Sequence, residues 1–89
     1  MDKMIIVPLN LFNFAQEILI ADENETKTFT QTELVNLPEV IMEASNAFGI
    51  SDVKLIGNGN YAEALSNEIK EYAIHNYSNN NLNITIVEA

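Results

Sequence analysis

The segment LIGNGNYAEALSNEI, residues 55–69, determines the fold that the sequence predicts. Its first residues complete an apolar strand, and the residues after Gly-Asn-Gly-Asn have apolar side chains at helical spacing. A strand that passes into a helix and then into another strand of the same sheet makes a right-handed crossover between parallel strands. The segment therefore predicts an α/β fold, and it raises the question of whether the glycine turn holds a ligand.

The rest of the chain adds strands and one more helix around this segment. The run MIIVPLNLF, residues 4–12, is almost wholly apolar, which predicts a strand covered on both faces. Proline cannot donate to a ladder, so this strand should bulge or end at Pro8. The expected elements, in chain order, are strands at 4–9, 15–22 and 26–31, a helix at 37–48, a strand at 52–57, a helix up to Tyr77 and a strand at 82–89.

Both helices have recognisable ends. Asn36 is the expected N-cap of the first helix and Gly49 its stop, while Asn60 is the expected N-cap of the second, with Glu63 as the reciprocal capping partner. SNNN, residues 78–81, ends the second helix. The expected buried faces consist of Leu37, Val40, Ile41, Ala44, Ala47 and Phe48 in the first helix, and Ala62, Leu65, Ile69, Tyr72 and Ala73 in the second.

These elements predict a single domain, residues 1–89, with the order β-β-β-α-β-α-β. The simplest arrangement is a mixed five-stranded sheet in which strands one, four and five are parallel, and strands two and three extend one side as an antiparallel meander. This order resembles the ribonuclease H-like fold over almost the whole chain, on topology rather than on a sequence motif. The resemblance implies an α/β domain and, in the nucleases of that fold, carboxylates that hold two metal ions.

The carboxylates that the resemblance implies are absent from the expected positions. Asp2 lies before the first strand, Asn10 follows its apolar part, and Asn58 stands at the end of the fourth strand. A neutral amide binds divalent ions far less strongly than a carboxylate. Residues 9–16 also contain no glycine, which the phosphate-binding turn of actin-like relatives needs. We therefore predict no metal site, no cofactor and no nuclease or kinase-like activity.

The charge of the chain restricts its partners. Thirteen acidic residues face four lysines, and the formal net charge is −9. Nucleic-acid binding needs cations that replace counterions, so we predict no direct contact with DNA or RNA. The acidic surface fits solubility, a basic partner protein or mimicry of DNA. No segment is long enough for a membrane span, and the absence of cysteine excludes disulfides.

The composition also suggests a source and a location. The frequent asparagine and isoleucine suggest an AT-rich genome, and a short, cysteine-free, asparagine-rich domain fits a phage or mobile-element source. We therefore expect a cytoplasmic protein, in the host cytoplasm if it is encoded by a phage.

The glycine turn has two interpretations. Gly57, Asn58, Gly59 and Asn60 could present backbone N–H groups to an anionic small molecule or nucleotide at the helix N-terminus. The alternative, which we favour, is a sharp turn in which the glycines adopt positive φ. Lys54 is the cation nearest in sequence, and no P-loop or dinucleotide motif is present.

The histidine and the tyrosines carry no recognisable chemistry. His75 is the single histidine and falls near the end of the second helix, where it favours the helix C-terminus as a partial cation. Tyr61, Tyr72 and Tyr77 recur at roughly helical intervals without basic residues among them, which indicates packing rather than a platform for stacked bases.

The last strand predicts an interface. An apolar strand at the edge of a sheet is a template for pairing unless lysine, proline or a bulge interrupts it, and residues 84–87 contain none of these. The expected patch consists of Ile74, Tyr77, Ile84, Thr85 and Ile86; alternatively, the strand is short and the helices shield it. We therefore predict a small, acidic, non-enzymatic domain that binds a protein partner or forms a homodimer. The alternatives are a small-molecule or nucleotide-binding domain and a DNA mimic that inhibits a host enzyme.

Overall fold

The computed structural model describes residues 3–10 and 15–89 of the chain. The elements follow the predicted order, with one short 3₁₀ helix added before the first α-helix. They are β1 (Met4–Pro8), β2 (Ala15–Ala21), β3 (Thr26–Glu33), η1 (Leu34–Asn36), α1 (Leu37–Phe48), β4 (Asp52–Gly57), α2 (Gly59–Tyr77) and β5 (Asn83–Glu88).

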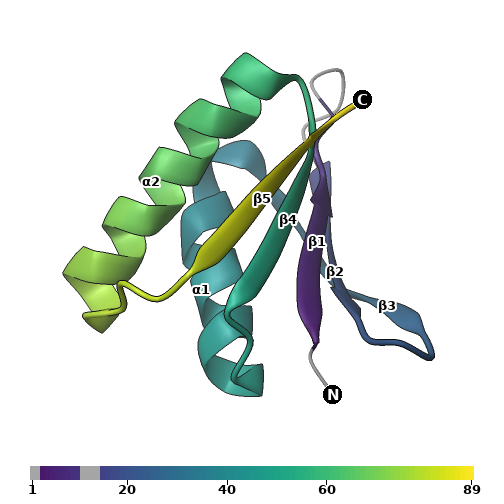
Figure 1. The fold of residues 1–89 in the computed structure, drawn as a ribbon, viewed down its shortest axis with the longest axis horizontal. Coiled ribbons are helices and arrows are strands. Elements are labelled where there is room, and N and C mark those ends of the chain that lie inside the picture. Colours follow the sequence, from purple (N-terminus) through teal and green to yellow (C-terminus); the bar gives the residue numbers. More distant parts are fainter. Residues whose placement is uncertain (1–2, 11–14) are drawn as a thin grey trace.

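The strands form one open, mixed sheet in the order β3-β2-β1-β4-β5 (Figure 1). β1, β4 and β5 run parallel, whereas β2 and β3 pair antiparallel, so the predicted α/β class and mixed sheet are confirmed. β1 ends at Pro8, as expected, although the Leu9 N–H still donates to the Ile56 carbonyl at 2.7 Å. β5 lies at one edge of the sheet and β3 at the other.

Both helices pack on one face of the sheet (Figure 1), and the core lies between them and the strands. In the described ranges no helix covers the opposite face, where Met4 and Ile6 of β1 and Ile56 of β4 are only half-buried. The expectation that β1 is covered on both faces is therefore not met. The core residues common to the helices and the strands include Ile5, Val7, Ile18, Leu37, Ile41, Val53, Leu55, Leu65 and Ile69.

The helix ends differ from the sequence prediction in two places. Asn36 precedes α1 but makes no capping hydrogen bond, because the 3₁₀ turn supplies the entry into the helix. The N-cap of α2 is Asn58, not Asn60: its side-chain oxygen accepts from the Tyr61 N–H at 3.2 Å, and α2 already begins at Gly59. Gly49 ends α1 with φ of 64°, as predicted.

The end of α2 uses serine in place of glycine. Ser78 adopts a left-handed conformation with φ of 52°, and its N–H donates to the Ile74 carbonyl while the Asn79 N–H donates to the Ala73 carbonyl. The bond from Ser78 is the 5→1 bond of an αL C-terminal cap, after which the chain turns back toward β5.

The predicted core is correct except at the end of α1 and in β2. Ala47 and Phe48 were expected to be buried but are exposed. Gln16 is fully buried, which the sequence did not indicate, because its side chain exchanges two hydrogen bonds with the backbone of Asn10, at 2.6 and 2.8 Å. Ser45 is also buried, and its hydroxyl donates to the Ile50 carbonyl.

Candidate functional site

β5 has one paired and one free side. The Asn83 N–H donates to the Ser51 carbonyl at 2.9 Å, and the Ala89 N–H donates to the Gly57 carbonyl at 3.4 Å. Backbone groups alternate in direction along a strand, so the odd-numbered residues of β5 bond to β4. The N–H and carbonyl groups of Ile84, Ile86 and Glu88 therefore point to the free side of the sheet.

The side chains of β5 alternate between the two faces of the sheet. Ile84 and Ile86 lie against the core and are half-buried, while Thr85 and Val87 are exposed on the opposite face, Val87 by 40%. β5 contains neither lysine nor proline, and its register with β4 is continuous over the whole strand. The edge that the sequence predicted is therefore present, without the lysine, proline or bulge that often prevents pairing.

The structure brings Ile74 to this edge but not Tyr77. Ile74 is 50% exposed and, with Leu82 just before β5, lines a hollow of about 200 Å³ whose other walls are Lys70, Asn79 and Asn80. Tyr77 lines a different hollow with Met42, Ser45 and Asn46 of α1. Its ring centroid lies 6.2 Å from that of Tyr72. The predicted patch therefore reduces to Ile74 and the β5 residues, which we call the β5 edge.

The glycine turn is tight for a reason other than the one predicted. Within the described ranges Gly49 is the glycine with positive φ, so Gly57 and Gly59 do not need left-handed backbone. A Cβ on Gly57 would lie 3.0 Å from the Cβ of Leu9, and a Cβ on Gly59 would overlap the carboxylate of Glu88. Neighbouring side chains therefore approach both glycines closely, the Cβ of Leu9 at Gly57 and the flexible end of Glu88 at Gly59.

The Glu88 side chain also bears on the ligand interpretation. Its carboxylate lies against Gly59 in the first turn of α2, where the helix dipole favours negative charge. An anion that bound at Gly57, Asn58, Gly59 and Asn60 would meet this carboxylate and have to displace it. The turn therefore carries its own anionic group, supplied by the last residue of β5.

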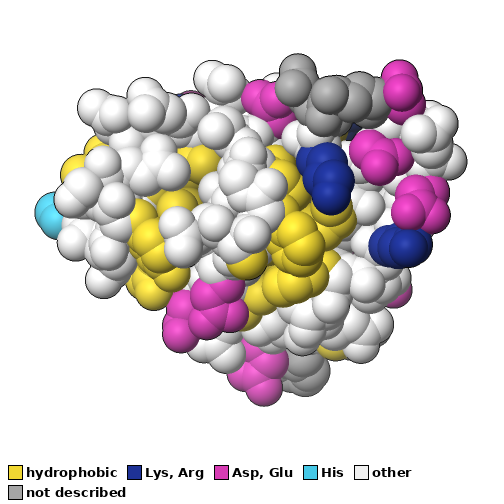
Figure 2. Space-filling model, turned by 90° about the horizontal axis from the view of Figure 1, so that it is seen from below, with side chains coloured by type: hydrophobic (Ala, Val, Ile, Leu, Met, Phe, Trp, Pro, Cys, Tyr) yellow, Lys and Arg dark blue, Asp and Glu magenta, His cyan; other side chains and the backbone are white. Residues whose placement is uncertain are grey.

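A second hollow, which the sequence did not indicate, lies beside the turn between β2 and β3. Its volume is about 290 Å³, and its walls are Lys3, Ile20, Asp22, Glu25, Lys27, Thr28, Phe29 and Phe48. The rings of Phe29 and Phe48 meet edge to face with centroids 5.6 Å apart, and the Lys3 Nζ lies 5.7 Å from the Phe48 ring centroid. Figure 2 views this end of the molecule, where hydrophobic side chains reach the surface beside lysine and acidic groups.

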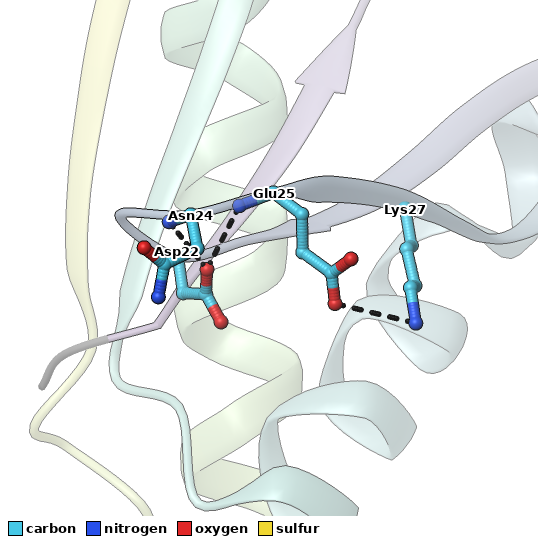
Figure 3. Close-up of polar contacts among 4 residues, drawn as sticks. All are labelled: Asp22, Asn24, Glu25 and Lys27. Carbon is cyan, nitrogen blue, oxygen red and sulfur yellow. Dashed lines mark hydrogen bonds and ion pairs between the residues drawn. The ribbon is translucent and has the colours of Figure 1, made fainter.

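The polar wall of this hollow is already bonded within the turn (Figure 3). Oδ1 of Asp22 accepts from the N–H groups of Asn24 and Glu25 at 2.8 and 3.0 Å, and these bonds lower the pKa of Asp22. The Lys27 Nζ lies 3.2 Å from the Glu25 carboxylate. The hollow therefore combines both charges, and its charged groups contact one another rather than converging on a ligand.

The helix layer is strongly acidic. Burial is the main cause that raises the pKa of Tyr72, and the charge of Glu39 on α1 raises it further. Burial, followed by the charge of Glu68, raises the pKa of Tyr61. His75 is exposed in the last turn of α2, where it was expected. The carboxylates of the two helices are Glu39, Glu43, Glu63, Glu68 and Glu71, against the single lysine Lys70.

The described residues also bear on metal binding and on membrane insertion. Residues 3–10 and 15–89 contain no group of three or more histidine, aspartate or glutamate side chains placed to hold a metal ion. No helix in the same ranges is long and apolar enough to cross a membrane.

Comparison with known proteins shows the fold alone. No protein-family model matches the chain, and no curated protein matches it in sequence. Among solved structures the chain is similar to Dom34 of S. cerevisiae, described as a translation termination-like factor that is involved in RNA quality control pathways and interacts with Hbs1. The TM-score is 0.64 at 14% identity, and the match covers 97% of this chain but 29% of Dom34.

Proposed function

We propose that the protein is a non-enzymatic interaction domain that associates with a second copy of itself through the β5 edge. The observation that carries the proposal is the row of outward backbone groups at Ile84, Ile86 and Glu88, on a strand without lysine, proline or bulge. Unpaired strand edges of this kind add a strand from another chain, and main-chain hydrogen bonds then supply the affinity.

The size of the domain supports association. A domain of 89 residues buries only about two thirds of the surface that its unfolded chain exposes, so its stability is modest without a partner. Ile74 and Val87, 50% and 40% exposed, are apolar groups beside β5 that a second copy can cover. An isologous contact places the same patch on both copies and closes after two.

We further propose that the fold is a ribonuclease H-like version of the mixed α/β sheet, used without catalysis. The support is the strand order β3-β2-β1-β4-β5 with β2 and β3 antiparallel. The resemblance implies one carboxylate in the first strand and another near the end of the fourth. β1 contains no acidic residue, and the capping amide of Asn58 follows β4. The cytoplasmic location and the phage or mobile-element source remain predictions from composition.

The acidic helix layer favours a second function. Five carboxylates against one lysine on α1 and α2 suit a basic protein partner, including an enzyme whose nucleic-acid site the domain would mimic. Titration with an oligolysine peptide tests this: binding that weakens in a Glu39→Gln, Glu43→Gln double variant supports it. Equal binding by that variant and the unchanged protein contradicts it.

Amide hydrogen exchange tests self-association at the proposed place. The N–H groups of Ile84, Ile86 and Glu88 should exchange more slowly as protein concentration rises, because a partner strand protects them. The amides of β3, at the opposite edge, should be unaffected and serve as the internal control. Exchange at these three amides that is independent of concentration, up to millimolar protein, contradicts the proposed function.

A further inference from the structure

We propose that two copies pair antiparallel with Ile86 of each copy on the two-fold axis, so that both sheets join into one continuous sheet. This inference rests on the proposed function and adds the partner, the strand direction and the register. It follows from which backbone groups of β5 are already used. Asn83 and Ala89 donate to β4, so the outward groups belong to Ile84, Ile86 and Glu88.

A parallel pair related by a two-fold axis cannot form the ladder. In such a pair each residue lies beside its own counterpart, and parallel bonding connects a residue to the neighbours of its counterpart. The outward groups of Ile86 would then need outward groups on Thr85 and Val87, and those point to β4 instead. The direction of the partner strand is therefore antiparallel.

Five antiparallel registers place outward groups opposite one another, and an axis at Ile84 or at Glu88 leaves only one such pair within the strand. With the axis at Ile86, the facing pairs are Ile84 with Glu88, Ile86 with its counterpart, and Glu88 with Ile84. Each pair exchanges two hydrogen bonds. An axis at Thr85 or at Val87 leaves two pairs within the strand, because Leu82 and any residue beyond Ala89 lie outside β5.

Charge and packing favour the same register. With the axis at Ile86, the two Glu88 residues are separated by four strand positions, or about 13 Å. With the axis at Val87 they come within two positions, or about 7 Å, and repel. On the open face, the exposed Val87 of one copy lies opposite Thr85 of the other and loses its contact with water.

The natural absence of cysteine makes the register measurable by cross-linking. Thr85→Cys and Val87→Cys each place one thiol on an exposed position of the open face, where neither contributes to the core. In the proposed register residue 85 faces residue 87 with Cα atoms about 4.5 Å apart, which suits a disulfide. Residue 85 and its own counterpart lie diagonally, about 7–8 Å apart, which is too far.

The experiment oxidises each variant alone and an equimolar mixture of the two, after circular dichroism has shown that both are folded. The proposal predicts a mixed 85–87 disulfide dimer in at least about tenfold excess over either symmetric dimer. A dominant 85–85 product would place the axis at Thr85, and a dominant 87–87 product would place it at Val87. Either result overturns the proposed register. If light scattering shows a dimer but neither the single variants nor their mixture cross-link, the interface lies elsewhere. A monomer at every concentration contradicts the proposed function as well as the register.

Discussion

The two edges of the sheet meet solvent in different ways. At β3, the register with β2 shifts between Ile18 and Leu19, so the pair contains a bulge, and Lys27 stands in the strand beside the Glu25 carboxylate. Its other residues are four threonines, Gln31, Glu33 and Phe29, and Phe29 is 37% exposed. At β5, the pairing with β4 is regular, the strand contains no lysine, and Val87 is 40% exposed.

This difference indicates what each edge does. Bulges, lysines and polar side chains are the means by which proteins prevent edge strands from pairing, and one edge of this sheet has all of them. The same chain leaves the other edge regular and apolar. This contrast supports the proposal that β3 ends the sheet and that β5 pairs with another copy.

The largest expected effect comes from proline at the axis. Ile86→Pro removes an outward N–H and adds a ring at the free side of β5, without removing a bond to β4. Dimer affinity should fall about 100-fold, or ~2.7 kcal/mol, as measured by sedimentation equilibrium. Ile86→Ala is the matched control, because it loses the same packing but keeps the N–H. Equal weakening by both variants would show that the backbone of β5 does not pair.

The next largest effect is expected at the glycines where β4 leads into α2, on the paired side of β5. Gly57→Ala brings a Cβ against Leu9 in a buried turn, and should destabilise the domain by about 1–3 kcal/mol in urea unfolding. Gly59→Ala should cost less, because the exposed side chain of Glu88 can move away. A larger loss of unfolding free energy for Gly59→Ala than for Gly57→Ala would mean that the Glu88 carboxylate is held in place. Gly59 would then be the more restricted of the two sites.

A matched pair of lysines compares the two edges directly. Thr85→Lys on β5 places a charge where Val87 of the second copy should lie, and should weaken the dimer about 10-fold. Thr28→Lys is the equivalent change at an exposed position of β3 and should leave dimer affinity unchanged. Both variants change the net charge by the same amount. If Thr28→Lys weakens the dimer and Thr85→Lys does not, then β3, and not β5, is the strand that pairs with the second copy.

Ionic strength should have the smallest effect. Each copy carries a formal charge of −9, so association brings like charges together. Raising the salt from 0.01 to 0.15 M shortens the screening length from about 30 to about 8 Å and should tighten the dimer a few-fold. A dimer that weakens with salt would indicate that ion pairs, rather than strand pairing, hold the copies together.

The sequence predicted the elements well because hydrophobic periodicity and chain stops are local. Gly49 and Pro8 end their elements where expected. The parallel direction of β1, β4 and β5 follows from the crossovers through the helices, and the antiparallel pairing of β2 and β3 follows from the meander. The cap of α2 was misplaced by two residues, because Asn58 and Asn60 are equally good caps in sequence. In the structure the Asn58 side chain accepts from the Tyr61 N–H, and the helix begins at Gly59.

The position of the candidate site, the β5 edge, was predicted in part. The apolar, uninterrupted sequence of β5 marks the edge, since the pattern and the topology are both readable. Tyr77 was assigned to the same patch because helical spacing does not tell which neighbour a residue outside the main apolar stripe meets, and it faces α1. The aromatic hollow of Phe29 and Phe48 depends on the bulge in β3 and the turn after β2, which have no clear periodic signal.

Light scattering of the unmodified protein across a dilution series tests the central claim most directly. If β5 pairs with a second copy, the weight-average mass at high micromolar concentration is about twice 9.9 kDa and falls to 9.9 kDa on dilution, in one transition with no larger species. A mass of 9.9 kDa at every concentration would contradict the account.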